Sequence, residues 1–399
     1  MNTFFRSFDT SIDLGGNAIV CVIGERTNNG PVQVRGWGQS PVDGLRHGQI
    51  DNLQALKTSL MMAVCAAECH ARVRVRRTAL TLGGYFFHSE HAVLRSPIGG
   101  SLVTQHDIDA MTQRIQRPGY VPAHIIPLFF SVDQNTNLHN PLGMAGKWIY
   151  GHFHIVWISD HLVTTFRAFF KECNITLTNV VSACVTDALV CIKQDQCHDR
   201  CILVNIGAYR TTVALHTHGK CHHQSTIAMG GHHVTEDIAA AYRMGIDKAE
   251  HIKVNFGAAL IDLEHYHKHI PLATGRDTEA CGSIPYTSLV DVVQARCQKM
   301  IQAIKECMAH FPTTDQPCTV YITGGGSRLT GIGELFQRIL GYPTLLVHSQ
   351  QDDACVQRAS ALGGMLYTCQ SVAKPYGHTW PKTRRWIKKV GMNMGIKRS

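Results

Sequence analysis

Several features common in other classes of protein are missing from this sequence. It has no apolar run of about 18 residues or more, which excludes an ordinary membrane-spanning helix. The segment Met1–Gly16 contains Asp9 and Asp13 and lacks the apolar core of a signal peptide, so we expect no export signal. Only 17% of the 399 residues are charged and 44% are hydrophobic, which indicates a folded chain long enough for two lobes.

Common zinc-binding spacings are also absent. The nearest approach to a cluster among the 15 cysteines is Cys191, Cys197, His198 and Cys201, and its spacing matches no common zinc pattern. Because a chain without an export signal is expected in the cytosol, we expect reduced thiols rather than disulfides. The 24 histidines include adjacent pairs without ligand spacing, so no metal is assigned to them.

Acidic residues are missing from the C-terminal part of the chain. The segment Ser371–Ser399 has eight Lys or Arg residues and no Asp or Glu, which accounts for much of the net charge of +9. Trp386–Ile396 can form a short amphipathic helix. Its apolar side would carry Trp386, Ile387, Val390 and Met394, and its basic residues are Arg384, Arg385, Lys388 and Lys389. This pattern favours a helix lying on an anionic membrane surface, and a disordered basic tail that binds nucleic acid is the alternative.

The first part of the chain predicts strands followed by a helix. Ser11–Glu25 predicts two strands joined by a turn at Gly15–Gly16, and Gln33–Gly38 predicts a third strand. Asp51 is expected to cap a helix. The apolar face of this helix is expected at Leu53, Leu56, Leu60 and Val64.

The middle of the chain differs in pattern. Leu80–Ile155 is expected to form an inserted subdomain of short strands with a helix near Gln105–Gln116. Helices are expected at Leu162–Cys173 and Val180–Cys191. Cys201–Leu215 then repeats the strand, glycine turn and strand of the opening, which suggests two halves built alike.

The remaining chain alternates between helical and strand patterns. Helices are expected at Val234–Arg243, Lys248–Asn255, Ser288–Ala309 and Ala359–Tyr367, and a strand at Cys318–Thr323. The helix Ser288–Ala309 has apolar residues at Leu289, Val293, Met300, Ile304 and Met308.

Three glycine turns each follow a predicted strand. They are Asp13–Asn17, Asn205–Arg210 and Gly324–Ser327. Glycine lets backbone N–H groups approach a phosphate, and Asp13 can hold Mg²⁺ through water. A plain hairpin turn would use the same residues at any one of these positions. All three in one chain predict a nucleotide held between two lobes.

Three further stretches complete the pattern. They are Ile227–Leu260, Ile322–Gly331 and the turn Asn140–Gly146. Together with the first phosphate loop they resemble the FtsA family of bacterial cell division proteins, over nearly the whole chain. The turn Asn140–Gly146 is similar to that of the family's inserted subdomain and favours FtsA over actin-like proteins at large.

The resemblance implies an α/β, actin-like two-lobed fold with an FtsA-type inserted subdomain and a C-terminal amphipathic helix. The implied segments are 1–82 and 160–192 for the first-lobe core, 83–159 for the inserted subdomain, 193–229 and 312–370 for the second-lobe core, 230–311 for its smaller subdomain, and 371–399 for a basic linker and membrane-targeting helix.

The resemblance also implies ATP or ADP with Mg²⁺ as the cofactor. The residues expected at the nucleotide are Asp13, Gly15, Gly16, Asn17, Asn205, Gly207, Arg210, Gly230, Gly231, Glu250, Lys253, Gly324, Gly325, Gly326 and Ser327. Glu250 and Lys253 are expected to face the ribose and adenine. From the residues alone, Asp247 and Glu250 could instead form a capping box, with Lys253 one turn later. Thr235–Asp237 could likewise serve only to begin a helix.

The second phosphate loop departs from the family. Asn205 replaces a carboxylate that would help hold Mg²⁺, and Ala208 and Tyr209 stand where the family has glycines. Arg210 could approach a phosphate or fill the cleft. Thr212 stands where the family is expected to have a further carboxylate, and in the first loop Ala18 stands where the family often has Lys. Because phosphoryl transfer depends on metal and positioning, we expect hydrolysis to be very slow or absent.

The function that the resemblance implies is scaffolding in cell division. The protein would bind the C-terminal peptide of FtsZ, polymerise along the cytoplasmic face of the inner membrane, and recruit later division proteins at the division site. Nucleic acid is not expected as a partner. The alternatives are a PilM-like pilus-assembly protein that binds a partner's peptide, and an ATPase or sugar kinase of the same superfamily.

Overall fold

The computed structural model describes residues 7–26, 32–46, 49–192, 199–271, 282–312, 317–347 and 358–371. The chain divides into two compact units. Unit 1 comprises Met1–Asp199, Ala214–Gln224 and Arg358–Ser399, and unit 2 comprises Arg200–Val213 and Ser225–Gln357. The candidate C-terminal membrane residues 384–394 lie outside the described part of the chain, so their helix stays a prediction.

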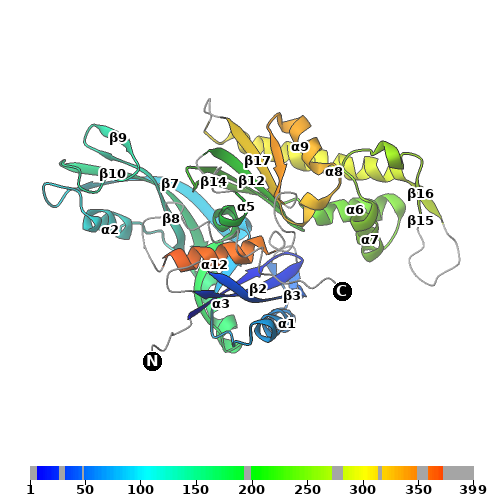
Figure 1. The fold of residues 1–399 in the computed structure, drawn as a ribbon, viewed down its shortest axis with the longest axis horizontal. Coiled ribbons are helices and arrows are strands. Elements are labelled where there is room, and N and C mark those ends of the chain that lie inside the picture. Colours follow the sequence, from blue (N-terminus) through cyan, green and yellow to red (C-terminus); the bar gives the residue numbers. More distant parts are fainter. Residues whose placement is uncertain are drawn as a thin grey trace. The chain divides into compact units, whose positions relative to one another are not determined.

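Unit 1 is built on a five-stranded sheet of order β11-β6-β1-β2-β3. Its strands β2 and β3 are labelled in Figure 1. The first three strands are β1 (Ser7–Leu14), β2 (Ala18–Arg26) and β3 (Gln33–Pro41), which form an antiparallel meander. β6 (Arg77–Leu82) runs parallel to β1, and β11 (Thr176–Ser182) runs parallel to β6. A small hairpin, β4 (Leu45–Arg46) and β5 (Gln49–Ile50), follows the meander.

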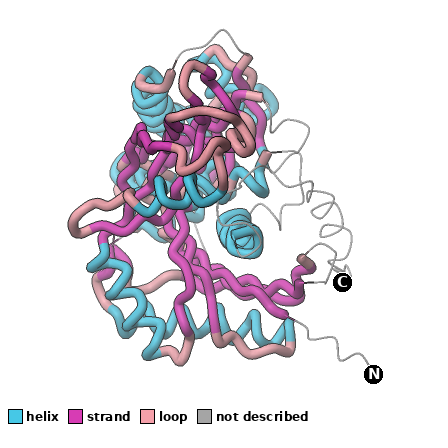
Figure 2. The backbone as a smooth tube through the Cα atoms, turned by 90° about the vertical axis from the view of Figure 1, so that its left-hand side faces the viewer, coloured by secondary structure: helices cyan, strands magenta, loops and turns pink. Residues whose placement is uncertain are grey.

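Helices cover both faces of this sheet. α1 (Leu53–Ala71) and α3 (Asp160–Glu172) bury their apolar residues against one face, in a core that includes Ile12, Ile19 and Phe166. α12 (Ala359–Ser371) packs on the other face (Figure 2). Two short helices, α4 (Ala183–Thr186) and α5 (Ala188–Cys191), follow β11 directly.

The inserted part of unit 1 is a four-stranded antiparallel sheet of order β7-β10-β8-β9. A short helix, η1 (Gly84–Phe86), leads into it. Its strands are β7 (Phe87–Pro97), β8 (Tyr120–Val132), β9 (Asn135–Leu138) and β10 (Trp148–Ser159). α2 (Gln105–Gln113) packs on one face, where Met111 joins a core that contains Phe153 and Trp157.

A second five-stranded sheet has the order β14-β13-β12-β17-β18. Its strands are β12 (Arg200–Ile206), β13 (Thr211–Thr217), β14 (Lys220–Ile227), β17 (Cys318–Thr323) and β18 (Thr344–Leu346). β12 and β17 are parallel neighbours, with Asn205 opposite Thr323. Because parallel neighbours end at the same edge of a sheet, the loops that follow β12 and β17 lie together.

The helices of unit 2 are α6 (Gly231–Tyr242), α7 (Ile246–Phe256), α8 (Tyr286–Ala309) and α9 (Ile332–Leu340). The short elements are η2 (Leu263–His265), η3 (Gly325–Arg328), β15 (His269–Pro271) and β16 (Ser283–Pro285). α8 buries Leu289, Val293, Met300 and Ile304, as its period predicts, and leaves Met308 partly exposed.

Several local predictions were wrong. Asn52, not Asp51, caps α1, because the Asn52 side chain accepts from the backbone N–H groups of Gln54 and Ala55. Leu53 is exposed and does not belong to the buried face. Val180–Cys191 begins as strand β11 and continues as α4 and α5, so it is not one helix.

The inserted region also differs from its predicted form. Its strands are mostly long rather than short, and Leu80 belongs to β6 of the first sheet. Prolines such as Pro122 and Pro127 led to the expectation of short strands, because proline usually interrupts a strand. In the structure both prolines lie within the long strand β8, next to shifts in its pairing register with β10.

Candidate nucleotide site

The two predicted phosphate hairpins have the same local geometry. The N–H of Gly15 donates to the carbonyl of Ala18 over 3.1 Å, and the N–H of Gly207 donates to the carbonyl of Arg210 over 2.9 Å. Each bond closes the turn between two antiparallel strands. The expectation of two similarly built strand, glycine turn and strand units is confirmed.

The first loop carries one of two neighbouring carboxylates in unit 1. Burial, and then the charge of Asp187, raise the pKa of Asp13 to about 8. Asp187 lies between α4 and α5 and is fully buried. Asp187 is not among the predicted site residues, because it lies in the apolar segment Val180–Cys191, which predicts a single helix. Its position shortly after the apolar strand Thr176–Ser182, just beyond α4, was the available signal.

The second and third glycine loops pack against each other in unit 2. Gly324 has φ = +86°, and a Cβ atom there would lie 2.3 Å from Oδ1 of Asn205 and 2.5 Å from the carbonyl of Ile206. A side chain at position 324 is therefore excluded by both backbone conformation and space. The structure brings Asn205 and Gly324 together, as the prediction of one shared site requires.

The second loop is also bonded to the start of α6. The N–H groups of Gly231 and His232 donate to the carbonyls of Gly207 and Ala208, over 2.9 and 2.7 Å. A Cβ atom at Gly230 would lie 2.4 Å from the carbonyl of Gly207, so this N-cap position requires glycine. Gly230 and Gly231 thus hold α6 against the second phosphate loop.

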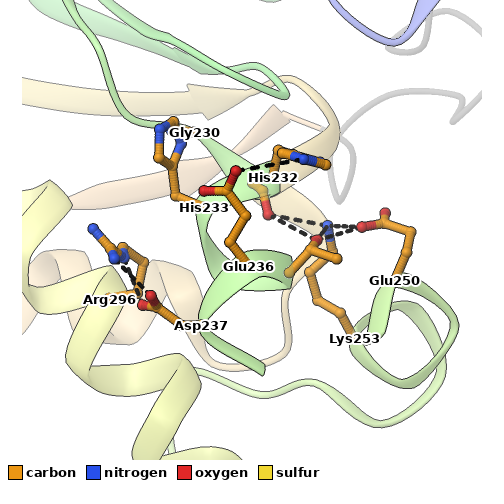
Figure 3. A network of polar contacts seen from close by, with 10 residues as sticks. Gly230, His232, His233, Glu236, Asp237, Glu250, Lys253 and Arg296 are labelled. Atoms are coloured by element: carbon orange, nitrogen blue, oxygen red, sulfur yellow. Dashed lines mark hydrogen bonds and ion pairs between the residues drawn. The ribbon is translucent and has the colours of Figure 1, made fainter. Parts of the chain in front are cut away.

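Glu250 and Lys253 join α7 to the first turns of α6 (Figure 3). Nζ of Lys253 donates to Oε2 of Glu250 over 2.6 Å, to Oγ1 of Thr235 over 2.9 Å and to the carbonyl of Gly231 over 3.1 Å. Thr235 donates in turn to Oε2 of Glu250. Burial opposes ionisation of Glu250, but the hydrogen bonds from Lys253 and Thr235 outweigh it and lower the pKa of Glu250.

This network corrects the predicted capping box. Gly245 is the N-cap of α7 and Asp247 lies within its first turn, so Asp247 does not cap the helix. Thr235 lies inside α6, which begins at Gly231, and does not begin a helix. Glu250 is about half buried and faces Thr235 and Lys253, which leaves part of its carboxylate accessible to a ligand.

Tyr209 fills space that glycine would leave open in the second loop. Its ring lies 4.7 Å from that of His232, centroid to centroid, and His232 Nε2 is 3.7 Å from Oε1 of Glu236. Burial, followed by the charges of Glu236 and Glu250, raises the pKa of Tyr209. Tyr209 therefore lies beside the same acidic groups that surround the start of α6.

Asp237 has a different partner. Its two carboxylate oxygens accept from Nε and Nη2 of Arg296 on α8, both over 2.6 Å (Figure 3). This bidentate ion pair ties α6 to α8. Asp237 is thus a structural residue of the Thr235–Asp237 stretch, and Thr235 is the member that faces Glu250 and Lys253.

The predicted residues divide between the two units. Asp13, Gly15, Gly16 and Asn17 belong to unit 1, and all others named for the nucleotide belong to unit 2. Oxygen donors such as Asp13 and Asp187 suit Mg²⁺. Among the described residues, no three His, Cys, Asp or Glu side chains are grouped so that they could hold a metal ion. No described helix is long and apolar enough to span a membrane.

The arrangement of strands, glycine hairpins and helices defines the class of protein as actin-like. The PilM–PilN type IV pilus biogenesis complex has a chain of similar fold, with a TM-score of 0.63 and 16% identity over 90% of this chain and 98% of that one. MreB5 of Spiroplasma citri bound to AMPPNP gives a TM-score of 0.55 at 14% identity, over 92% and 97%. These likenesses concern the fold.

Sequence relatives identify the family within this class. The family model described as "Cell division protein FtsA" matches residues 202–363, and that for the "SHS2 domain inserted in FTSA" matches residues 86–157. FtsA of Neisseria meningitidis is 24% identical over 83% of this chain and 81% of its own length. FtsA of Escherichia coli is 22% identical over 84% and 82%. The chain belongs to the FtsA family of the actin-like ATPase superfamily.

The prediction of the family and that of an actin-like fold with an inserted subdomain are therefore confirmed. The inserted subdomain is the antiparallel sheet with α2, and its matched residues lie within the predicted segment 83–159. The boundaries proposed for the other segments stay predictions, as do the roles of individual residues toward nucleotide.

Proposed function

We propose that this cell division protein is a scaffold that anchors FtsZ filaments to the cytoplasmic face of the membrane and recruits later division proteins. The observation that carries the proposal is an exposed apolar surface in the smaller part of unit 2, which we call the α7–η2 surface. We define it by five exposed large apolar residues that are close in the sequence, on α7 and around η2: Ile246, Val254, Ile261, Leu263 and Tyr266.

The exposure of this surface is high for large apolar side chains. Leu263 is 84% exposed and Val254 is 70% exposed. Several exposed large apolar side chains within one short stretch of chain favour a partner site, because single exposed residues are common but groups of them are not. We infer that the C-terminal peptide of FtsZ is the occupant, since a short peptide can bury a few apolar anchors in such a surface.

A peptide pull-down tests this role. A Val254→Asp, Leu263→Asp double variant should lose retention on an immobilised FtsZ C-terminal peptide by about tenfold or more, because two apolar anchors become charged. Met62→Asp is the matched control, since Met62 is 59% exposed on α1 of unit 1. Full retention of the folded double variant would exclude this surface as the peptide site.

For the cofactor we propose ATP or ADP with Mg²⁺, bound weakly and hydrolysed poorly. Asp13 and Asp187 would hold Mg²⁺, which supplies neutralising charge for the phosphates when bound. Glu250 and Lys253 would contact the nucleoside, supported by their mutual position on α7. Asn205, which lacks a carboxylate, and Tyr209, which occupies the loop beside Glu236, both argue against efficient hydrolysis.

Membrane attachment is assigned to the basic tail, and self-association into filaments would strengthen it. The proposal rests on the residue pattern between Arg384 and Met394, which lies outside the described residues. The PilM-like alternative has one observation in its favour, the TM-score of 0.63. In the same pull-down, retention by a pilus-protein peptide instead of the FtsZ peptide would favour it.

A further inference from the structure

A histidine of the inserted sheet is hydrogen-bonded to the start of the turn that carries Asp187. The backbone N–H of Ser182, at the end of β11, donates to Nε2 of His124 over 2.8 Å. His124 lies on β8 and is 2% exposed. The N–H of Asp187 donates to the carbonyl of Ala183, so the turn continues directly from Ser182. An imidazole of the inserted subdomain therefore fixes the point at which the turn begins.

α12 contacts the same turn and β1, the strand that carries Asp13. A Cβ atom at Gly363 would lie 2.4 Å from the carbonyl of Thr186, the residue before Asp187. A Cβ atom at Gly364 would lie 2.1 Å from Oγ1 of Thr81 and 2.7 Å from Oγ of Ser11, two residues before Asp13. Real Cβ atoms essentially never approach other atoms within 3.0 Å, so a side chain at either position would force its neighbours to shift: the backbone of Thr186 at Gly363, and the side chains of Thr81 and Ser11 at Gly364.

His124 and α12 are also in contact with each other. The ring of Tyr367 on α12 packs edge-on against His124, with centroids 4.7 Å apart. Oγ of Ser11 and Oγ1 of Thr81 lie 3.3 Å apart beneath Gly364. α12, His124, the Asp187 turn and the end of β1 thus form one packed group within unit 1.

We infer that His124, Gly363 and Gly364 are positioning residues that set the separation of the Asp13 and Asp187 carboxylates, and with it the size of the cation that this pair accepts. The inference rests on the proposed nucleotide site, whose Mg²⁺ these carboxylates would hold. Mg²⁺ requires oxygen ligands at about 2.0–2.1 Å, whereas Ca²⁺ takes them at about 2.3–2.6 Å. A larger separation between the Asp13 and Asp187 carboxylates therefore favours Ca²⁺ over Mg²⁺.

The glycines give the first test. Mg²⁺ and Ca²⁺ are titrated calorimetrically into the full chain with ADP present, and the ratio of the two affinities is compared among variants. Gly363→Ala and Gly364→Ala should each lower the Mg²⁺ to Ca²⁺ affinity ratio by about fivefold or more, because the added methyl group forces the segments apart. Gly83→Ala is the control, since a Cβ atom there meets nothing within 4 Å. A purely structural role would lower Tm and leave the ratio unchanged.

His124 gives the second test, which stands even if the glycine variants fail to fold. His124→Gln keeps an acceptor for the N–H of Ser182 and should preserve the ratio within about twofold, whereas His124→Leu removes it and should lower the ratio. An unchanged ratio in the folded His124→Leu protein would overturn the inference and leave the cation site standing. A wild-type chain that binds neither ion would overturn the proposed cation site and the inference with it.

Discussion

Nζ of Lys253 lies 2.6 Å from Oε2 of Glu250, three residues earlier on the same helix. The ammonium group is largely buried, with 13% of the side chain exposed, and its other acceptors are on α6. The pair therefore links two helices and presents part of one carboxylate to a ligand. Its hydrogen bonds are all to protein groups, so this structural role is compatible with the proposed nucleoside role.

Replacing Lys253 should separate these roles. Lys253→Met should weaken ADP binding by about tenfold or more, because hydrogen bonds to charged groups contribute roughly 1.5–3 kcal/mol. Calorimetry with millimolar Mg²⁺ and ADP measures the effect. Arg338→Met is the control, since it removes an exposed ion pair with Glu334 on α9. No heat and no thermal shift in the wild-type protein would show that the chain does not bind nucleotide at all.

Restoring the second phosphate loop should strengthen the binding of Mg²⁺ with nucleotide. Asn205→Asp adds a carboxylate for the metal, and Arg210→Thr, made with it, removes a long side chain from the turn. The isosteric change at position 205 keeps the packing against Gly324. Affinity for Mg²⁺-ATP should rise by about threefold or more in the double variant. Unchanged affinity in a folded protein would contradict the placement of this loop beside the phosphates.

Asp237 should affect stability and not nucleotide. Asp237→Asn weakens the bidentate pair with Arg296 and should lower the free energy of unfolding by about 1 kcal/mol, since both side chains are partly exposed and screened. Urea unfolding measures this loss, and nucleotide affinity should change by less than about twofold. A large loss of affinity with unchanged stability would assign Asp237 to the ligand instead.

Two buried histidines should make the fold sensitive to acid. Burial, together with the neighbouring His91, His223, His222 and His124, lowers the pKa of His154 to about 2. Burial lowers the pKa of His216 to about 4, although its bond to the carbonyl of Cys184 acts in the opposite direction. Below pH about 6.5 the unfolded chain binds protons that the folded chain does not. The free energy of unfolding that these two neutral histidines contribute is therefore fully present above pH about 6.5. It decreases as the pH falls through 6 and 5.

His154→Leu tests this linkage. Because one pKa unit corresponds to about 1.4 kcal/mol, the variant should lose about 2 kcal/mol less than the wild type between pH 6.5 and 5. Urea unfolding at several pH values measures the difference. His161→Leu, at an exposed position on α3, should leave the pH dependence unchanged. Parallel curves for wild type and His154→Leu would refute the role of this imidazole.

The tail prediction concerns membrane attachment. Trp386→Glu should release the full chain from anionic liposomes, because it places a charge in the apolar side of the predicted helix, where a buried side chain contributes roughly 1.5–3 kcal/mol. Lys388→Glu with Lys389→Glu should abolish the preference for anionic lipid. Co-sedimentation measures both effects. Equal retention after deletion of residues 384–399 would contradict the assignment.

The sequence by itself determined the class of fold and the main elements. The class of fold followed from the resemblance of several motifs to the FtsA family. The hairpins at Ser11–Glu25 and Cys201–Leu215 followed from strand and glycine-turn patterns, because a hairpin is a local structure and its turn residues carry the signal. Helical periodicity located α8 to within about two residues at its start. These features depend on residues near one another in the chain.

Only the tertiary structure decided which polar residues meet. Asp187 lay in an apolar segment, and its approach to Asp13 depends on the parallel order of β1, β6 and β11, which no local pattern specifies. Asp237 and Thr235 lie two residues apart on α6, so their side chains point in different directions, one to α8 and one to α7. The sequence could predict which residues belong to a site. Which of their side chains contact one another depends on how distant elements pack, and only the tertiary structure shows that.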